Sequence, residues 1–368
     1  MHLHIVAFNI PWPADYGGVI DVFYRVKALA DAGVKVHLHC FAYGRDEAPE
    51  LAQLCHEVHY YHRRTGILSQ LSVRPYIVSS RESQELLVRL QEDSYPILLE
   101  GLHCCALLEK LDTSSRLIYV RTHNVEHYYY SALARAEHTL WRRLFFRLEA
   151  ARLRRYETVL RQASAVLAIS ETDASHFLEL GCRNVLLLPP CHGNSRVCSL
   201  PGCGDYILYH GNLSVPENEH AALYLIRKVF FGLQHRLVIA GRNPGETISS
   251  AVAQCSNVSL VADPEDEELD ELIRKAHVNI LVTDQATGVK LKLLNALYKG
   301  RFCLVNSSMV QGTNLADACV VADTLESQQS AINSLMSTPF DEQQLQHRKS
   351  LLPPSDPART IIGLMAQV

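Results

Sequence analysis

The stretch TGVKLKLLNALYKGRFCLVN, residues 287–306, has the pattern of a short helix followed directly by a strand. Thr287 or Gly288 can begin the helix, and Gly300 stands just past its last turn, where glycine commonly caps a helix. The apolar residues after Gly300 predict a strand over 301–306. The stretch therefore predicts one helix–strand step of an α/β fold.

The first turn of this helix contains two lysines, Lys290 and Lys292. The helix dipole already places roughly half a positive charge at that end, so helix starts usually favour Asp or Glu. Two cations beside free N–H groups suit a bound anion. The alternative is that one lysine only extends into solvent past the apolar face of the helix.

The same unit, a short apolar strand, a turn and an amphipathic helix, recurs along the whole chain. Because strands alternate with helices, we expect parallel sheets covered by helices on both faces. The predicted strands lie near residues 3–8, 34–41, 57–61, 97–100, 116–121, 165–169 and 184–188, and then near 206–210, 236–240, 258–261, 278–282, 301–306 and 319–321.

A segment rich in Pro, Gly and Ser, residues 189–205, separates the two series of strands and is predicted to be a linker. It divides the chain into an N-terminal domain, 1–190, and a C-terminal domain, 205–350. The tail, 351–368, ends in a short apolar helical pattern, and we expect it to pack back on the first domain. Two such domains would form a cleft between the carboxyl ends of their strands, where open α/β sheets bind ligands.

Composition limits the class of protein. The 368 residues fit two domains, and 48% apolar with 20% charged residues is ordinary for a globular protein. The net charge of −4 gives no reason to expect nucleic acid as a partner. No apolar run approaches the ~20 residues of a membrane span, and Ile5–Phe8 is too short for a signal-peptide core. We therefore expect a cytoplasmic protein.

The 11 cysteines are an odd number with irregular spacing, which favours reduced thiols over a disulfide framework. Cys191, Cys198 and Cys203 gather with His192 in the linker, but their spacing matches no common zinc pattern, so we predict no metal site. The chain has no G-x-G-x-x-G after its first strand, no P-loop and no D-x-D run. A dinucleotide oxidoreductase and a P-loop ATPase are therefore disfavoured.

The chain resembles the nucleotide-sugar-dependent glycosyltransferases with two facing Rossmann-like domains, the GT-B fold, and among them the bacterial family 4 type. The order and spacing of the matching stretches carry the resemblance over nearly the whole chain. These stretches are PADYGGVIDVFYRVKALADAGVKVHLHCF (13–41), RTHNVEHYYY (121–130), AVLAISETDASHFLELG (165–181), LYHGNLSVPENEHAALYL (208–225), LVIAGRNP (237–244) and TGVKLKLLNALYKG (287–300).

The resemblance implies a hexosyltransferase that moves a sugar from a nucleoside diphosphate sugar to a glycan or lipid-linked acceptor in surface polysaccharide biosynthesis. It also implies retention of the anomeric configuration and no metal or other cofactor, because the lysines of the donor helix would neutralise the diphosphate. Two alternatives stay open: a nucleotide-sugar 2-epimerase of the same architecture, and a non-catalytic relative that binds nucleotide or glycan.

The resemblance also assigns site residues. His123 and Glu126 are the catalytic candidates, although a structural His123 held by Asn124 or Glu126 is an equal alternative, and Arg121 can orient Glu126 or contact phosphate. The donor-binding candidates are Gly17, Gly18, Asn212, Arg242, Gly288, Lys290, Lys292 and Asn295.

Two departures from the family pattern concern the donor. The family usually has two glutamates eight positions apart, and Thr287 and Asn295 stand there in this chain. An asparagine amide can still bond a ribose hydroxyl, but without charge. Asn212 replaces an arginine that often follows the glycine of the first donor-domain strand.

Residues 140–161 are predicted to form one long helix with an apolar stripe and arginines to one side of it. The stripe contains Leu140, Trp141, Leu144, Phe145, Leu148 and Ala151, and the arginines are Arg143, Arg147 and Arg154. Peripheral contact with the inner face of a membrane and packing in a core both explain such a pattern.

Overall fold

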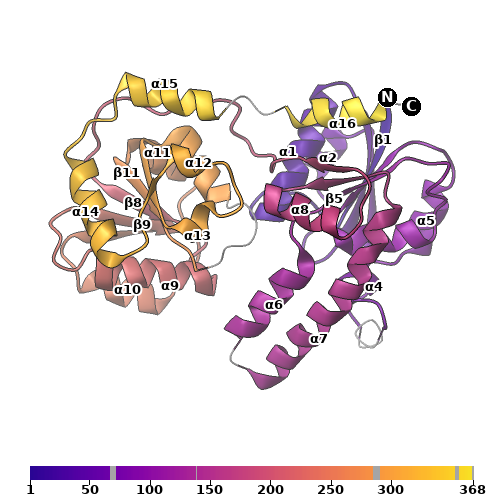
Figure 1. Cartoon of the computed structure of the whole chain (residues 1–368), viewed down its shortest axis with the longest axis horizontal. Helices are drawn as coiled ribbons and strands as arrows, with labels where there is room; N and C mark the ends of the chain where they lie inside the picture. The colour runs from indigo at the N-terminus through magenta and orange to yellow at the C-terminus, as the bar shows by residue number, and fades with distance from the viewer. Residues whose placement is uncertain (67–71, 138, 285–290, 353–355, 367–368) are drawn as a thin grey trace. The chain divides into compact units, whose positions relative to one another are not determined.

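The structure is a computed structural model of the chain, and it describes residues 1–66, 72–137, 139–284, 291–352 and 356–366. The chain forms two compact units (Figure 1). Unit 1 comprises residues 1–193 and 355–368, and unit 2 comprises residues 194–354. The cleft that we expect between the domains stays a prediction.

Unit 1 contains a seven-stranded sheet in the order β3-β2-β1-β4-β5-β6-β7, and neighbouring strands are all parallel. The order of the strands reverses between β1 and β4, which is the topological switch point where such sheets bind ligands. The strands are β1 (His2–Ala7), β2 (Lys35–Ala42), β3 (Glu57–His62), β4 (Ile97–Glu100), β5 (Ile118–Arg121), β6 (Ala165–Ala168) and β7 (Val185–Leu187).

Helices cover both faces of this sheet, because its strands are apolar on both sides and each face carries its own buried core. The helices are α1 (Gly17–Asp31), α2 (Pro49–Leu54), α4 (Tyr76–Ser79), α5 (Gln84–Leu90), α6 (Glu126–Ala136), α7 (Leu140–Tyr156), α8 (Glu171–Glu179) and α16 (Pro357–Met365), with 3₁₀ helices η1 (Leu102–Glu109) and η2 (Glu157–Gln162).

The C-terminal helix α16 belongs to unit 1. Ala358, Ile361 and Leu364 are buried in the same core as Val22 and Val26 of α1. The Tyr119 hydroxyl of β5 donates a hydrogen bond to the Leu364 carbonyl at 3.1 Å. The chain thus returns to its first sheet after it has completed unit 2.

Unit 2 contains a six-stranded parallel sheet in the order β10-β9-β8-β11-β12-β13, with its switch point between β8 and β11. The strands are β8 (Ile207–His210), β9 (Leu237–Gly241), β10 (Val258–Ala262), β11 (Val278–Leu281), β12 (Phe302–Val305) and β13 (Val320–Val321). The helices are α9 (Pro216–Tyr224), α10 (Glu246–Ala253), α11 (Asp266–Lys275), α12 (Leu291–Lys299), α13 (Ser307–Val310), α14 (Leu325–Met336) and α15 (Glu342–Leu351), with a π-helical turn, η3 (Leu225–Val229), and a 3₁₀ helix, η4 (Ala316–Ala318).

Two glycines bring the ends of β8 and β9 together in unit 2. A Cβ atom built on Gly241 would lie 1.8 Å from the Gly211 carbonyl oxygen, so a larger residue does not fit at this position. The close approach places the residues after both strands side by side, and Leu213 N–H donates to the Arg242 carbonyl at 2.9 Å.

The structure corrects the prediction of one continuous helix over 140–161. Helix α7 ends at Tyr156, and the 3₁₀ turn η2 follows it to Gln162. The interpretation of its apolar stripe as core is also wrong. Leu140 and Trp141 are 76% and 82% exposed, while the buried residues of α7 are Glu149, Ala150 and Leu153.

Two further expectations concern the whole chain. All eleven cysteines are free thiols, which agrees with the expected absence of a disulfide framework. Among the helices that the structure describes, none combines the length and the apolar character that a membrane span requires.

Candidate functional site

A group of five charged or titratable side chains lies at the carboxyl ends of β4 and β5, next to the switch point of unit 1. We call Asp21, Arg25, Glu100, Arg121 and His123 the strand-end cluster. Asp21 and Arg25 come from α1, Glu100 ends β4, Arg121 ends β5, and His123 follows β5. All five are buried, and His123 is the most exposed at 9%. Charges removed from water to this degree require close partners.

Arginines pair with both carboxylates of the cluster. Arg25 Nη2 lies 2.6 Å from Asp21 Oδ2, and Arg25 Nε lies 2.8 Å from Glu100 Oε1. Arg121 Nη2 lies 3.1 Å from Asp21 Oδ2. The backbone N–H of Cys191 donates to Asp21 Oδ1 at 2.6 Å, which ties the start of the linker to the cluster.

These contacts change the pKa values of the cluster. Burial alone would raise the pKa of Asp21, but the positive charges of Arg121 and Arg25 lower it well below its ordinary range. Burial would lower the pKa of Arg25, and the carboxylates of Asp21 and Glu100 raise it above its ordinary value. These two shifts favour the ion pair between Asp21 and Arg25.

His123 bridges the two carboxylates. Its Nε2 lies 3.0 Å from Glu100 Oε2, and its Nδ1 lies 3.3 Å from Asp21 Oδ2. Because both ring nitrogens face carboxylates, a direct hydrogen bond to a sugar would require one of these contacts to open. The partners of the ring are thus Asp21 and Glu100, in place of the Asn124 or Glu126 that the sequence suggested.

Gly17 and Gly18 begin α1, beside the cluster. A Cβ atom built on Gly18 would lie 2.9 Å from Phe8 Cζ, and the Phe8 ring packs edge-on against His123 at 5.3 Å between ring centres. Gly18 therefore leaves room for the ring that supports His123. Gly17 is exposed at the helix start, and the side chain of the N-cap residue Tyr16 does not cap the helix.

Glu126 begins α6 and is buried, at 4% exposure. Burial, together with the carboxylates of Glu157 and Asp173, raises the pKa of Glu126 to about 8. A carboxyl group with this pKa is largely protonated at neutral pH, so it has the property of a general acid. Its chain neighbour His127 has a different environment.

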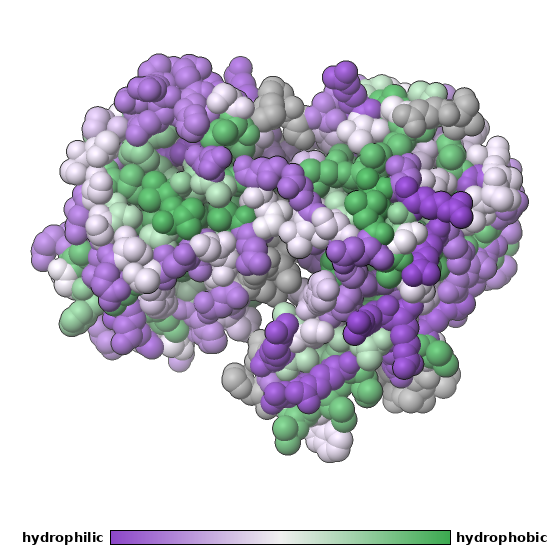
Figure 2. All heavy atoms as spheres, viewed as in Figure 1, coloured by the Kyte–Doolittle hydropathy of each residue, from purple (hydrophilic) through white to green (hydrophobic). Residues whose placement is uncertain are grey.

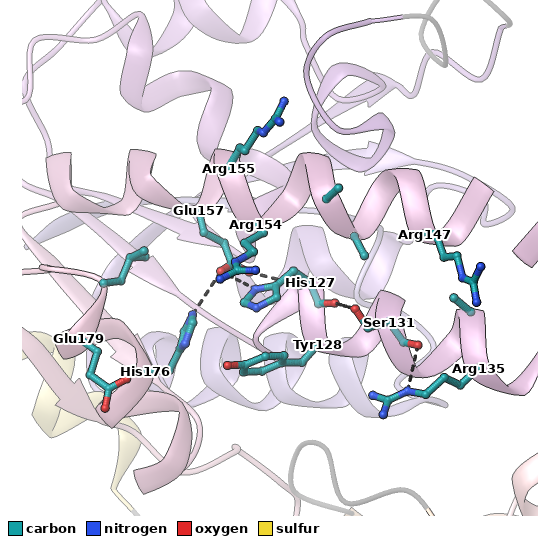
Figure 3. A pocket seen from close by; sticks show the side chains of 14 residues that line it. His127, Tyr128, Ser131, Arg135, Arg147, Arg154, Arg155, Glu157, His176 and Glu179 are labelled. Atoms are coloured by element: carbon teal, nitrogen blue, oxygen red, sulfur yellow. Dashed lines mark hydrogen bonds and ion pairs between the residues drawn. The ribbon is translucent and has the colours of Figure 1, made fainter. Parts of the chain in front are cut away.

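His127 of α6 and His176 of α8 share the buried carboxylate of Glu157. His127 Nδ1 lies 2.8 Å from Glu157 Oε2, and His176 Nε2 lies 3.2 Å from the same atom (Figure 3). The three side chains have the ligand types of a metal site, as does a second group, His2 of β1, His37 of β2 and His56, which directly precedes β3.

His127, Glu157 and His176 line a pocket of about 1190 Å³ between α6, α7 and α8. Figure 3 shows Arg147, Arg154 and Arg155 on one helix and Tyr128, Ser131 and Arg135 on the helix opposite. We call this the arginine pocket. The sequence singled out Arg147 and Arg154 as arginines beside the apolar stripe of the helix, but it predicted no pocket there.

In unit 2, two of the predicted donor residues gather at the switch point. Lys292, in the first turn of α12, donates to Asn218 Oδ1 at 2.8 Å and lies 5.2 Å from the centre of the Tyr209 ring. Asn218 Nδ2 in turn donates to the Asn212 carbonyl at 2.9 Å. Asn218 therefore joins Asn212 and Lys292 into one polar group.

Two other donor candidates have partners of their own. Arg242, after β9, forms an exposed ion pair with Asp266 at 3.0 Å, and such pairs contribute little stability. Asn295 Oδ1 accepts a hydrogen bond from Asn194 Nδ2 at 2.8 Å. Thr287, Gly288 and Lys290 lie outside the described residues, so their assignments stay predictions.

Sequence reasoning missed Asp21, Arg25 and Glu100. A signal for them was present, because Asp21 and Arg25 stand four residues apart among the buried positions of α1, with Val22 and Val26. Charged residues at core-facing positions of a helix indicate a buried ion pair. Nothing in the sequence shows that Glu100, in another strand, completes it.

Comparisons with known proteins extend these observations. No family model matches the chain. A Klebsiella pneumoniae protein described as an uncharacterized 44.6 kDa protein in the cps region is 26% identical over 341 residues, which cover 87% of this chain and 87% of that protein.

Solved structures match the fold over the full length of the chain. TarM has a TM-score of 0.69 at 8% identity, covering 100% of this chain and 98% of its own. A glycosyltransferase from Rickettsia africae has a TM-score of 0.66 at 9% identity, and the match covers 100% of this chain and 97% of that one. The lipopolysaccharide outer core galactosyltransferase WaaB has a TM-score of 0.65 at 11% identity, and the match covers 100% of both chains. The resemblance to GT-B glycosyltransferases is thus confirmed at the level of the fold, and family 4 membership stays a prediction.

Proposed function

We propose that this protein is a glycosyltransferase that moves a sugar from a nucleoside diphosphate sugar to a glycan or lipid-linked acceptor in surface polysaccharide biosynthesis. One observation carries the proposal: a chain with the GT-B fold has polar and charged side chains at the switch points of both of its sheets. The cps-region relative supports a role in polysaccharide synthesis. We place the reaction in the cytoplasm, at the inner face of the membrane.

The donor diphosphate is assigned to the start of α12. Lys292 bonds the neutral amide of Asn218, and a diphosphate would offer it a charged acceptor, which forms a stronger hydrogen bond. The predicted Gly288 and Lys290 precede Lys292 in the chain and would add N–H groups and charge. Asn295 would bond the ribose in place of the usual glutamate.

The sugar is assigned to the strand-end cluster of unit 1. The ring of His123 lies between two carboxylates, near the start of α1, where Gly17 and Gly18 would allow a ligand to approach the backbone. Glu126, largely protonated at neutral pH, would act as an acid toward the leaving group or acceptor. The configuration at the anomeric carbon would be retained.

A nucleotide-sugar 2-epimerase is the second candidate, and the raised pKa of Glu126 favours it, because epimerisation needs an acid and a base near one carbon. A panel of nucleoside diphosphate sugars, with and without acceptor, separates the candidates. A transferase releases the nucleoside diphosphate, an epimerase converts the donor without release, and a binding protein does neither. Absence of both reactions with every donor would overturn the enzymatic proposal.

Metal independence is tested in the same assay. We expect donor turnover to survive EDTA, because Lys290 and Lys292 would supply the charge that a metal would otherwise provide. Loss of turnover in EDTA that Mn²⁺ or Mg²⁺ restores would contradict this expectation, and His127, Glu157 and His176 would then be the first group to examine.

A further inference from the structure

The arginine pocket has an excess of positive charge. Four arginines line it, Arg135, Arg147, Arg154 and Arg155, and all four are exposed. The acidic lining residues are Glu157, which bonds two imidazoles, and Glu179. The pocket therefore attracts anions.

Within the part of the chain that the structure describes, no ion pair of these four arginines is found. The contrast on the same helix is Arg152, which pairs with the buried carboxylate of Glu149 at 2.8 Å. Arg135 donates a hydrogen bond to the Ser131 carbonyl of its own helix. The guanidinium groups of the pocket thus keep donors for an external ligand, and their planar geometry suits phosphate oxygens.

The arginine excess argues against a cation as the natural ligand. His127, Glu157 and His176 have the ligand types for a metal, but a divalent ion there would lie in the same pocket as four guanidinium groups. The carboxylate of Glu157 is also occupied by both imidazoles. A phosphate group has the opposite charge and fits the surroundings.

An exposed apolar surface adjoins the pocket. Four residues of the apolar stripe of α7, Leu140, Trp141, Leu144 and Leu148, have exposures of 76%, 82%, 49% and 53%. α7 packs along α6, and the two helices project from the body of unit 1 (Figure 1). Figure 2 shows apolar atoms at the far end of this pair, bordered by hydrophilic side chains.

The stripe and the pocket meet along one helix. Arg147 lies three residues after Leu144, so the two side chains are neighbours on the helix surface, and it directly precedes Leu148. A helix that lies in a membrane interface buries its apolar face ~5–10 Å deep. The arginine beside the stripe would then stand at the level of the lipid headgroups.

We propose that the arginine pocket binds the phosphate or diphosphate group of a lipid that carries the acceptor sugar, while the apolar stripe of α7 enters the membrane. The inference deepens the proposed function, on which it rests, because it names the class of acceptor and the surface that receives it. The nucleotide sugar is assigned to the start of α12 in unit 2, so an experiment can contradict the lipid-phosphate site without contradicting the donor site, and the reverse.

The test measures binding of the full chain to phosphatidylcholine vesicles with and without phosphatidic acid, which displays a phosphate monoester. We expect the protein to prefer the vesicles that contain phosphatidic acid over an equal charge of phosphatidylserine. The double variant Arg147→Ala/Arg154→Ala should lose this preference, with affinity lower by ~10-fold or more. Leu140→Ser/Trp141→Ser should weaken binding to all vesicles.

Arg142→Ala is the matched control, because Arg142 is exposed on the same helix and does not line the pocket. An equal loss of binding to phosphatidic acid vesicles in this control would show that a basic helix attracts anionic lipid in general, and it would overturn the proposal that the pocket binds the phosphate. Equal binding of the parent protein to all vesicles, or none, would also overturn it. Failure of the parent to bind any nucleoside diphosphate would instead overturn the proposed function and leave the vesicle result standing.

Discussion

Two charged regions of unit 1 differ in how their charges are balanced. In the strand-end cluster every carboxylate has a positive partner, and Asp21 alone contacts Arg25, Arg121 and His123. In the arginine pocket four guanidinium groups face a space of about 1190 Å³. The first region is buried and balanced within the protein, whereas the second is open and has an excess of one charge.

The difference shows what each region contributes. A buried charge that lost its partner would destabilise the fold, so the cluster fixes the positions of α1, β4 and β5 at the switch point. An exposed arginine without an ion pair costs little, so it can be kept for a ligand. Mutations that remove one charge at a time from each region test this distinction directly.

The largest effect is expected in the cluster. Asp21→Asn keeps the shape of the side chain but leaves Arg25 and Arg121 without a shared counter-charge, and we expect a loss of about 3–5 kcal/mol in the free energy of unfolding. Arg154→Ala in the pocket should change it by no more than about 0.5 kcal/mol. Urea denaturation of both variants measures these changes in the free energy of unfolding. Similar losses in the two variants would contradict the distinction between the cluster and the pocket.

The next effect concerns whether the cluster also acts in the reaction. We expect His123→Ala to lower turnover by ~10²-fold or more while nucleotide affinity stays near that of the parent. Turnover is measured per folded molecule, beside the melting temperature and the pH profile of kcat. If the variant only melts at a lower temperature and keeps its turnover and pH profile, His123 has a structural role alone.

Lys292 extends the comparison to unit 2 as an intermediate case, since it donates a hydrogen bond to the neutral amide of Asn218. Lys292→Ala should weaken binding of the nucleoside diphosphate by about 1.5–3 kcal/mol and leave the bare nucleoside nearly unaffected. Lys299→Ala is the control, because Lys299 stands at the other end of α12 and pairs with Asp270 at 2.5 Å. Calorimetric titration measures both affinities. Equal losses of affinity for the nucleoside and for the nucleoside diphosphate would show that Lys292 does not bind the diphosphate.

The smallest effect, taken per pH unit, is a dependence of stability on pH at Glu126, the first residue of α6. Its pKa is raised from 4.5 to about 8 in the folded protein, so the folded state holds a proton that the unfolded state releases. The stabilisation is complete below pH 4.5 and is lost as pH rises toward about 8, by about 1.4 kcal/mol per pH unit. Unfolding free energies of the parent and Glu126→Gln across this interval measure it.

Glu126→Gln should remove this slope, because an amide does not titrate. Its stability relative to the parent should therefore increase as the pH rises toward 8. Parallel curves for the two proteins would mean that Glu126 is ionised in the folded state, and that it lacks the proton required of an acid.

The alternation of strands and helices could be predicted from the sequence, because it depends on local periodicity. The apolar runs near 3–8 and 206–210 became β1 and β8, and Gly17 and Gly18 became the first turn of α1. Two parallel sheets follow from that alternation, since a helix between consecutive strands returns the chain to the same end of the sheet.

Only the tertiary structure decided which residues meet. His123 lies 102 positions from Asp21 and 23 from Glu100 in the chain, and they contact each other because β4 lies between β1 and β5 in the sheet. The order of strands depends on the packing of the whole unit, which no local pattern reports. The periodicity of α7 likewise predicted an amphipathic helix, but whether its apolar face is covered depends on the elements around it, and Leu140 and Trp141 lie beyond them.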